Sequence, residues 1–174
     1  MTATPGDVAR AMVMVAVDPA TAFAVFTEEI DVWWRRGRRF RIGGLDATTM
    51  TLEPRLGGRL FETYETKAGP RAHQIGTVLV WEPPTRLVLE WRNVNFAPTE
   101  RTEVEVRFEA APRGTRVTVE HRGWAAIRSD HPARHGQGVP EFIASTGRWW
   151  GDLAMSLRRV ALARATSSSP PSAS

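Results

Sequence analysis

The sequence predicts an α+β fold in which a curved antiparallel sheet of about six or seven strands wraps around one long C-terminal helix. Three observations support this prediction. Short alternating segments are separated by turns rich in glycine and proline, a short helical region follows the first strand, and apolar residues recur at helical spacing near the C-terminus. Strands joined by tight turns pair antiparallel, and the apolar face of such a sheet needs a helix to cover it.

The first strand and the helices after it are marked by local sequence signals. Val8 to Val17 is rich in valine and methionine and alternates loosely, which predicts a strand. Asp18 can cap a helix, and Pro19 suits the first helical position because its missing N–H has no partner there. Apolar residues from Phe23 to Ile30 recur at helical spacing, so we expect two short helices, the second ending near Trp34.

Two antiparallel hairpins are expected in the middle of the chain. Thr48 to Glu53 and Arg59 to Thr66 flank a turn with two glycines, which accept positive φ without strain. Gln74 to Glu82 and Arg86 to Asn93 flank two consecutive prolines, which cannot donate hydrogen bonds to a strand ladder. The polar residues between these hairpins are expected to form a turn.

A third hairpin gives the direction of individual side chains. Thr102 to Ala110 and Thr115 to His121 alternate clearly on either side of a Pro-Arg-Gly turn. Because successive side chains of a strand point to opposite faces, His121 lies on the same face as Val117 and Val119. We therefore expect His121 to point toward the apolar interior.

The C-terminal region is predicted to contain the helix that the sheet encloses. Pro140 to about Arg164 carries an apolar stripe that includes Phe142 and Trp149. Residues 1–164 are expected to form a single domain. Ala165 to Ser174 is rich in serine and proline, and we expect it to be a disordered tail.

Composition narrows the classes of function. The absence of cysteine excludes disulfides and thiolate catalysis and is consistent with a cytoplasmic protein, and no apolar run is long enough for a membrane span. The formal charge of +4 comes mainly from arginine, Lys67 being the single lysine, which is typical of a GC-rich bacterial genome. Many of these arginines fall in one run, made up of Arg35, Arg36, Arg38, Arg39 and Arg41.

This arginine run has two interpretations. Charge runs are usually solvated, so we expect residues 35–47 to be a solvated loop. Alternatively, the run could contact an acidic protein partner, a lipid headgroup or nucleic acid. The net charge of the chain alone gives no reason to predict nucleic acid binding.

Five segments resemble those of a known superfamily. They are Asp18-Pro19 with Trp33-Trp34, RLGGRLFE at 55–62, WEPPTRLVLEW at 81–91, EHRGW at 120–124 and GRWWGDL at 147–153. Together with the element order, they resemble the SRPBCC superfamily, and within it the branch named for activators of the ninety-kilodalton heat-shock protein ATPase. The resemblance implies a helix-grip fold with a cavity between the sheet and the C-terminal helix.

Aromatic residues are the main candidates for the walls of such a cavity. The chain is richer in tryptophan than a core of this size requires. The ligand-binding candidates are Trp33, Trp34, Phe61, Tyr64, Trp81, Trp91, Phe108, His121, Phe142 and Trp149. Trp124 and Trp150 belong to the same aromatic set. For any single member, ordinary core packing is the alternative.

Three residues are candidates for proton transfer, namely His121, Glu62 and Tyr64. A histidine titrating near neutrality can move a proton, although a structural histidine with satisfied hydrogen bonds is the favoured interpretation. Glu62 lies on a mixed face, and if it enters the cavity it would need a partner such as Arg59 or Arg71.

A metal site and a bound cofactor are not expected. Asp130-His131 with His135 superficially suggests a metal site, but Pro132 and Gly136 indicate a loop, and no third strong ligand is nearby in the sequence. The sequence contains neither a phosphate-binding glycine loop nor a dinucleotide fingerprint.

These observations favour a carrier or sensor that binds a small apolar or aromatic molecule in its cavity. A polyketide cyclase or dehydratase using His121 is one alternative. A chaperone-associated interaction module is another, and association with a protein partner or as a homodimer remains open.

Overall fold

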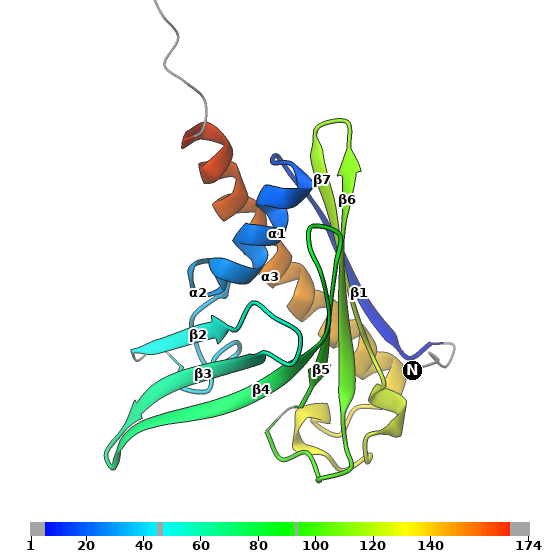
Figure 1. Cartoon of the computed structure of the whole chain (residues 1–174). Helices are drawn as coiled ribbons and strands as arrows, with labels where there is room; N and C mark the ends of the chain where they lie inside the picture. The colour runs from blue at the N-terminus through cyan, green and yellow to red at the C-terminus, as the bar shows by residue number, and fades with distance from the viewer. Residues whose placement is uncertain (1–5, 45–46, 93, 168–174) are drawn as a thin grey trace, which may run out of the picture.

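The computed structural model describes residues 6–44, 47–92 and 94–167 (Figure 1). Its elements in chain order are β1 Val8–Val15, α1 Pro19–Glu28, α2 Ile30–Trp33, β2 Thr48–Leu52, β3 Arg59–Thr66, β4 Gly69–Glu82, β5 Arg86–Trp91, β6 Thr102–Ala111, β7 Gly114–Arg122, the 3-10 turns η1 Trp124–Ala126 and η2 Pro132–Arg134, and α3 Val139–Ser167.

The described strands form one antiparallel seven-stranded sheet in the order β1-β7-β6-β5-β4-β3-β2. Neighbouring strands of this sheet are consecutive in the chain, except that the first strand, β1, pairs with the last, β7. Figure 1 shows the sheet curving, with α3 crossing it and α1 and α2 beside α3. The predicted α+β helix-grip fold is therefore confirmed.

Local sequence accounts for the beginning of the helical layer. The Asp18 carboxylate accepts a hydrogen bond from the Thr21 amide at 2.7 Å, and Pro19 occupies the first turn of α1. This amide hydrogen bond lowers the pKa of Asp18. Phe23 and Phe26 then project from α1 into the core, where they contact Phe108 with ring centroids 5.1 and 5.6 Å apart.

Two element boundaries differ from the sequence-based prediction by more than two residues. Strand β4 begins at Gly69 rather than Gln74, because residues expected to turn instead continue the pairing with β3 as far as Thr66 opposite Gly69. Helix α3 extends to Ser167, so residues 165–167 are helical rather than part of a disordered tail. The remaining tail residues lie outside the described part of the chain.

The core lies between the sheet and the C-terminal half of α3. Leu153 and Ala161 of α3 are fully buried, as are Leu87 of β5 and Val104 and Val106 of β6. A hollow in this region, bordered by Phe26, Trp33 and Leu153, measures only about 10 Å³. Within the described residues, no helix is both long and apolar enough to cross a membrane.

A cavity between the sheet and helix α3

The N-terminal half of α3 borders a cavity of about 540 Å³. The segment that follows α2, together with β3, β4, β5 and β7, forms its other walls. The apolar or aromatic residues that line it are Trp34, Phe40, Ile42, Ile75, Trp91, Val94, Trp124, Ala133, Phe142 and Trp149. The polar residues are Arg38, Arg39, Arg41, Glu62, His73, Arg92, His121, His135, Gln137, Ser145 and Thr146.

Three tryptophans form a continuous aromatic wall. Trp34 stacks on Trp91, with ring centroids 6.0 Å apart and planes inclined by 20°. Trp149 meets both rings edge to face, at 5.7 Å from Trp34 and 6.3 Å from Trp91. Such contacts hold each ring in one orientation and leave flat apolar surface toward the cavity.

The indole N–H groups of this wall are bonded to the chain segment beside it. The Trp34 N–H donates to the Phe40 carbonyl at 3.0 Å, and the Trp149 N–H donates to the Arg39 carbonyl at 2.8 Å. Because both donors are satisfied by backbone, the rings do not need a polar ligand to complete their hydrogen bonds. Trp149 also ties α3 to the arginine-rich segment.

His121 lies at the inner end of the cavity and is 2% exposed, as its alternation in β7 predicts. The Trp150 indole N–H donates to Nδ1 at 3.2 Å, and Nε2 lies 2.8 Å from Thr102 Oγ1. Since an indole can only donate, the proton of the neutral ring sits on Nε2 and is donated to Thr102. Thr102 in turn donates to the Trp91 carbonyl at 3.2 Å.

This chain of hydrogen bonds defines the chemistry of His121. Burial lowers the pKa of His121 from 6.5 to about 3. The ring is therefore neutral at pH 7, and both of its nitrogens are engaged. This geometry matches the structural histidine with satisfied hydrogen bonds that the sequence analysis favoured over a group that moves protons.

Glu62 enters the cavity wall and is 1% exposed. Its two carboxylate oxygens accept hydrogen bonds from the backbone amides of Ile42 and Gly43 at 2.9 and 3.0 Å. The prediction that Arg59 would pair with Glu62 is wrong, because Arg59 bonds to Glu53 instead. Glu62 thus holds the segment after α2 against β3, and two backbone dipoles offset its charge.

Gly43 is required where this segment meets the sheet. A Cβ atom on Gly43 would lie 2.2 Å from the Thr48 Cγ2 atom and 2.9 Å from the Tyr64 Cβ atom. Both distances are shorter than carbon atoms can approach. The glycine therefore allows the backbone to come close enough for Glu62 to accept its amide hydrogen bond.

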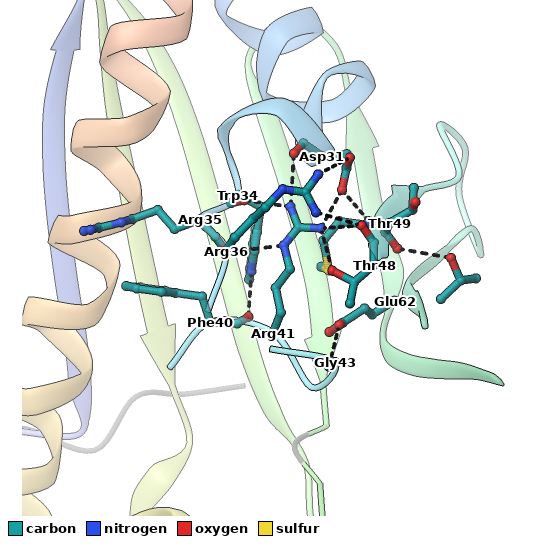
Figure 2. Close-up of polar contacts among 12 residues, drawn as sticks. Asp31, Trp34, Arg35, Arg36, Phe40, Arg41, Gly43, Thr48, Thr49 and Glu62 are labelled. Carbon is teal, nitrogen blue, oxygen red and sulfur yellow. Dashed lines mark hydrogen bonds and ion pairs between the residues drawn. The ribbon is translucent and has the colours of Figure 1, made fainter. Parts of the chain in front are cut away.

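Arg41 differs most from the solvated loop expected for the arginine run, because its side chain has no exposed surface. Figure 2 shows its guanidinium inside a ring of acceptors. It donates to the Asp31 carboxylate at 2.6 Å, to the Trp34 carbonyl at 2.7 Å and to the Thr48 carbonyl at 3.2 Å. Arg35 and Arg39 remain on the surface, where both pair with Asp152 of α3.

The structure divides the aromatic candidates into two groups. Trp34, Trp91, His121, Phe142 and Trp149 line the cavity. Trp33, Phe61, Tyr64, Trp81 and Phe108 are absent from its walls.

Neighbouring side chains fill the space around the second group. Trp81 meets Phe23 of α1 edge to face at 5.0 Å, and Phe108 also packs on α1. Trp33 is buried beside Phe26, and its N–H donates to the carbonyl of that residue. Phe61 is half-buried beneath the Arg59 guanidinium, which lies 4.9 Å from its ring centroid.

Several lining residues were not among the sequence-based binding candidates. Trp124 belonged to the aromatic set, and the positive φ of 98° at Gly123 turns the chain so that this ring lies against His121 and Phe142. Arg92 directly follows the inward-facing Trp91, and Arg38 lies in the arginine run. Neither position carries a sequence pattern that distinguishes a cavity wall from a solvated surface.

The histidines near η2 do not form a metal site in the structure. His131 is buried, and its Nδ1 accepts a hydrogen bond from the Ala133 amide at 3.1 Å. His135 is exposed and borders the cavity. Within the described residues, no three histidine, cysteine or acidic side chains are placed to share a metal ion.

Solved structures with similar folds come from several bacteria. A protein from Nitrosomonas europaea is 15% identical with a TM-score of 0.62, and the match covers 94% of this chain and 99% of that one. A protein from Cytophaga hutchinsonii is 12% identical with a TM-score of 0.63, covering 95% and 99%. The Aha1 dimer from Colwellia psychrerythraea is 14% identical with a TM-score of 0.56, covering 89% and 96%. Identities this low establish likeness of fold alone.

Sequence comparison identifies the family. The comparison with curated proteins finds no match. The family profile described as Activator of Hsp90 ATPase homolog 1-like protein matches residues 16–145, which is most of the chain. The match includes β2 to β7 and the beginning of α3, and therefore most of the cavity wall. The chain belongs to the family of Activator of Hsp90 ATPase homolog 1-like proteins.

Proposed function

We propose that this protein binds a small apolar or aromatic molecule in the cavity between α3 and the sheet. The observation that carries the proposal is a hollow of about 540 Å³ whose deep walls are the rings of Trp34, Trp91, Trp124 and Phe142. Ligand pockets typically measure roughly 300–1,000 Å³ and are lined mainly by apolar and aromatic side chains with a few polar groups.

The wall is organised before a ligand arrives. The N–H groups of Trp34 and Trp149 are bonded to backbone carbonyls, and the rings contact one another edge to face or stacked. A rigid aromatic wall loses little conformational entropy on binding, which favours affinity for a flat or apolar guest. The arrangement therefore supports a binding protein.

The polar residues of the cavity do not favour the cyclase or dehydratase alternative through His121 or Glu62. His121 is neutral with both nitrogens bonded, and both oxygens of Glu62 accept backbone amides. General acid–base catalysis requires a group that reaches the substrate and exchanges a proton near the working pH. Tyr64 does not line the cavity.

Binding can be tested with N-phenyl-1-naphthylamine, a neutral fluorophore whose emission rises in apolar surroundings. We expect saturable binding with one site per chain and a change in tryptophan emission. Ser145 lines the cavity from α3, so Ser145→Phe places a ring in the hollow and should weaken binding at least about tenfold.

Ala144→Phe is the matched control for this experiment. Ala144 precedes Ser145 on the same helix but is exposed and does not line the cavity. The control variant should bind the fluorophore like the wild type. Absence of saturable binding by the wild type, or equal effects of the two variants, would contradict the proposal.

We also propose that two copies associate through β1, which is the last strand at one edge of the sheet. Met12 and Met14 are 63% and 41% exposed on this strand, and the similar protein from Colwellia psychrerythraea is a dimer. Light scattering should give a dimer mass that Met12→Glu reduces. Met155→Glu changes a methionine that is 54% exposed on α3 and should leave the mass unchanged. A wild type that is monomeric at all concentrations rules this interface out.

A further inference from the structure

The basic side chains that line the cavity indicate which chemical class of ligand it would bind. Arg38, Arg39, Arg41, Arg92, His73 and His135 line the hollow together with a single acidic residue, Glu62. Four arginines against one glutamate give a formal excess of three positive charges in the wall. The structure shows how much of this excess is already neutralised.

Two of the arginines are paired within the protein. Arg41 is enclosed and pairs with Asp31 at 2.6 Å, and Arg39 pairs with Asp152 at 2.7 Å. Glu62 is held by two backbone amides and pairs with neither of the remaining arginines. The charge that is left in the wall therefore belongs to Arg38 and Arg92.

Only some of the hydrogen-bond donors of the Arg92 guanidinium have acceptors among the described residues. Two of its guanidinium N–H groups donate to the carbonyls of Ala97 and Pro98, at 2.9 and 3.4 Å. A guanidinium carries five N–H donors, so three remain, and carbonyl acceptors do not cancel its charge. Within the described residues, no carboxylate lies within ion-pair distance of Arg92.

Arg38 lies on another side of the same cavity. It is exposed, and its side chain rests against Gly44, where an added Cβ would be 3.0 Å from its Cγ atom. No hydrogen bond or ion pair joins Arg38 to another described residue. It therefore offers an unoccupied guanidinium from the segment after α2, while Arg92 offers one from the end of β5.

The exposed fractions of these side chains show that the aromatic part of the wall lies deep in the cavity and the cationic part lies near its opening. Trp34, Trp91 and Trp124 are at most 6% exposed and form the depth of the cavity. Arg38 is exposed and Arg92 is half-buried, so they stand toward its opening. An apolar interior below an unpaired cationic rim matches a molecule with an apolar body and one acidic end.

We propose that the ligand is an amphipathic organic acid, with its apolar or aromatic body against the tryptophans and its carboxylate at Arg38 and Arg92. This inference rests on the proposed binding function and specifies its ligand class. An arginine and a carboxylate form short, charge-assisted hydrogen bonds that are stronger than neutral ones. The guanidinium plane also suits two parallel bonds to one carboxylate.

Competition against N-phenyl-1-naphthylamine tests this inference with two molecules of one shape. 2-Naphthoate carries a carboxylate, and 2-naphthalenemethanol carries a neutral hydroxymethyl group on the same rings. We expect the acid to displace the fluorophore at an about tenfold lower concentration, since hydrogen bonds between charged groups are stronger than hydrogen bonds to a neutral hydroxyl. Raising the salt concentration should weaken the acid and leave the alcohol unchanged.

Charge-removing variants assign the effect to residues. Arg38→Gln and Arg92→Gln should each weaken the acid several-fold and leave the alcohol unchanged. Arg158→Gln, at an exposed position in the C-terminal half of α3 away from the cavity, is the control and should change neither. A variant that merely disturbed the fold would weaken acid, alcohol and fluorophore together.

The possible failures are distinguishable. If the fluorophore binds and the alcohol competes as well as the acid, the acidic ligand class is wrong while the binding function stands. If the acid is favoured but neither Arg38→Gln nor Arg92→Gln reduces the preference, the assignment to these arginines is wrong. If the fluorophore itself does not bind, both proposals fail.

Discussion

The buried cation Arg41 fixes the segment between α2 and β2. Its guanidinium donates to the Asp31 carboxylate and to the carbonyls of Trp34 and Thr48. Burial alone would raise the pKa of Asp31, but hydrogen bonds from the Met50 amide and Arg41 outweigh burial and lower this pKa. The pair is therefore ionised at pH 7 and holds one wall of the cavity.

Removing Arg41 should destabilise the fold strongly. Arg41→Gln leaves the Asp31 carboxylate and several carbonyls without their donor, and we expect a loss of about 3 kcal/mol in the free energy of unfolding. Arg36→Gln is the control, because Arg36 also bonds to Asp31 and Thr48 but its side chain is 51% exposed. Its loss should stay below about 1 kcal/mol. Equal losses in urea unfolding would contradict the structural role of Arg41.

His121 should make stability depend on pH. Its pKa is about 3 in the folded protein and near 6.5 when unfolded, so between these values the unfolded chain binds more protons. This contribution to stability is complete above pH 6.5 and is lost as the pH falls toward 3. The slope should approach about 1.4 kcal/mol per pH unit.

The His121→Gln variant isolates this effect. The readout is the slope of unfolding free energy between about pH 5 and 6.5, where most carboxylates stay ionised in both states. Burial also lowers the pKa of His131, so part of the slope should remain in the variant. His73→Gln, at a half-buried position, is the control. An unchanged slope in the His121 variant would mean that this ring is not held neutral by the fold.

At the scale of elements, α3 has two different halves. Its C-terminal half packs Leu153, Leu157 and Ala161 against the core, whereas its N-terminal half presents Phe142 and Trp149 to the cavity. Gly151 lies between these halves with open space around the position of a Cβ atom. The helix is therefore weakened there by a residue that packing does not require.

Gly151→Ala should stabilise the protein by about 0.5–1 kcal/mol, because alanine has the higher helix propensity and meets no neighbour. Gly76→Ala is the opposite case, since its Cβ would lie 2.5 Å from the Glu90 carbonyl oxygen of the paired strand. We expect that variant to lose about 1–3 kcal/mol. Thermal unfolding should shift in opposite directions for the two, and a destabilising Gly151→Ala would show that the helix is not regular at this point.

The elements were largely predictable because their signals are local. Alternation and turn residues identified the hairpins around Pro83-Pro84 and Gly114, and helical spacing identified α3. Strand periodicity also placed His121 on the inner face correctly. These features depend on neighbouring residues in the chain, and so the sequence alone reveals them.

The cavity wall was only partly predictable because it depends on distant packing. Trp81 and Phe108 were plausible wall residues, but Phe23 of α1 fills the space beside them. Trp91 lines the hollow because only the N-terminal half of α3 passes over it. Periodicity gives the face of a strand and cannot give the distance to the helix that crosses it. Arg41 was missed for the same reason, since its acceptors come from two separate segments, α2 with its C-cap Trp34 and the start of β2.

At the scale of the whole molecule, one core connects all layers. The same cluster of buried residues includes Val13 of β1, Phe26 of α1, Leu60 of β3, Val106 of β6 and Leu157 of α3. A second, smaller cluster around Trp124 and Phe142 closes the other end of the cavity. The first and last strands, β1 and β7, pair in this sheet, so the core cannot open in separate parts without breaking β1 from β7.

Unfolding should therefore be a single cooperative transition. Tryptophan fluorescence reports α3 and the cavity wall, and far-ultraviolet circular dichroism reports the backbone of the sheet. The two should give coincident midpoints in urea, as expected for a single domain of this size. Two separate midpoints would show that the cavity end and the packed end are independent units.

The C-terminal half of α3 packs in the core, whereas its N-terminal half borders the cavity. This division also affects how proteins of this kind can diversify. Distant substitutions affect stability almost independently. Exchanges beside Phe142 and Trp149 can alter which guest is accepted while Leu153 and Leu157 still anchor the helix. A lineage can thus acquire new chemical preferences without losing the ability to fold.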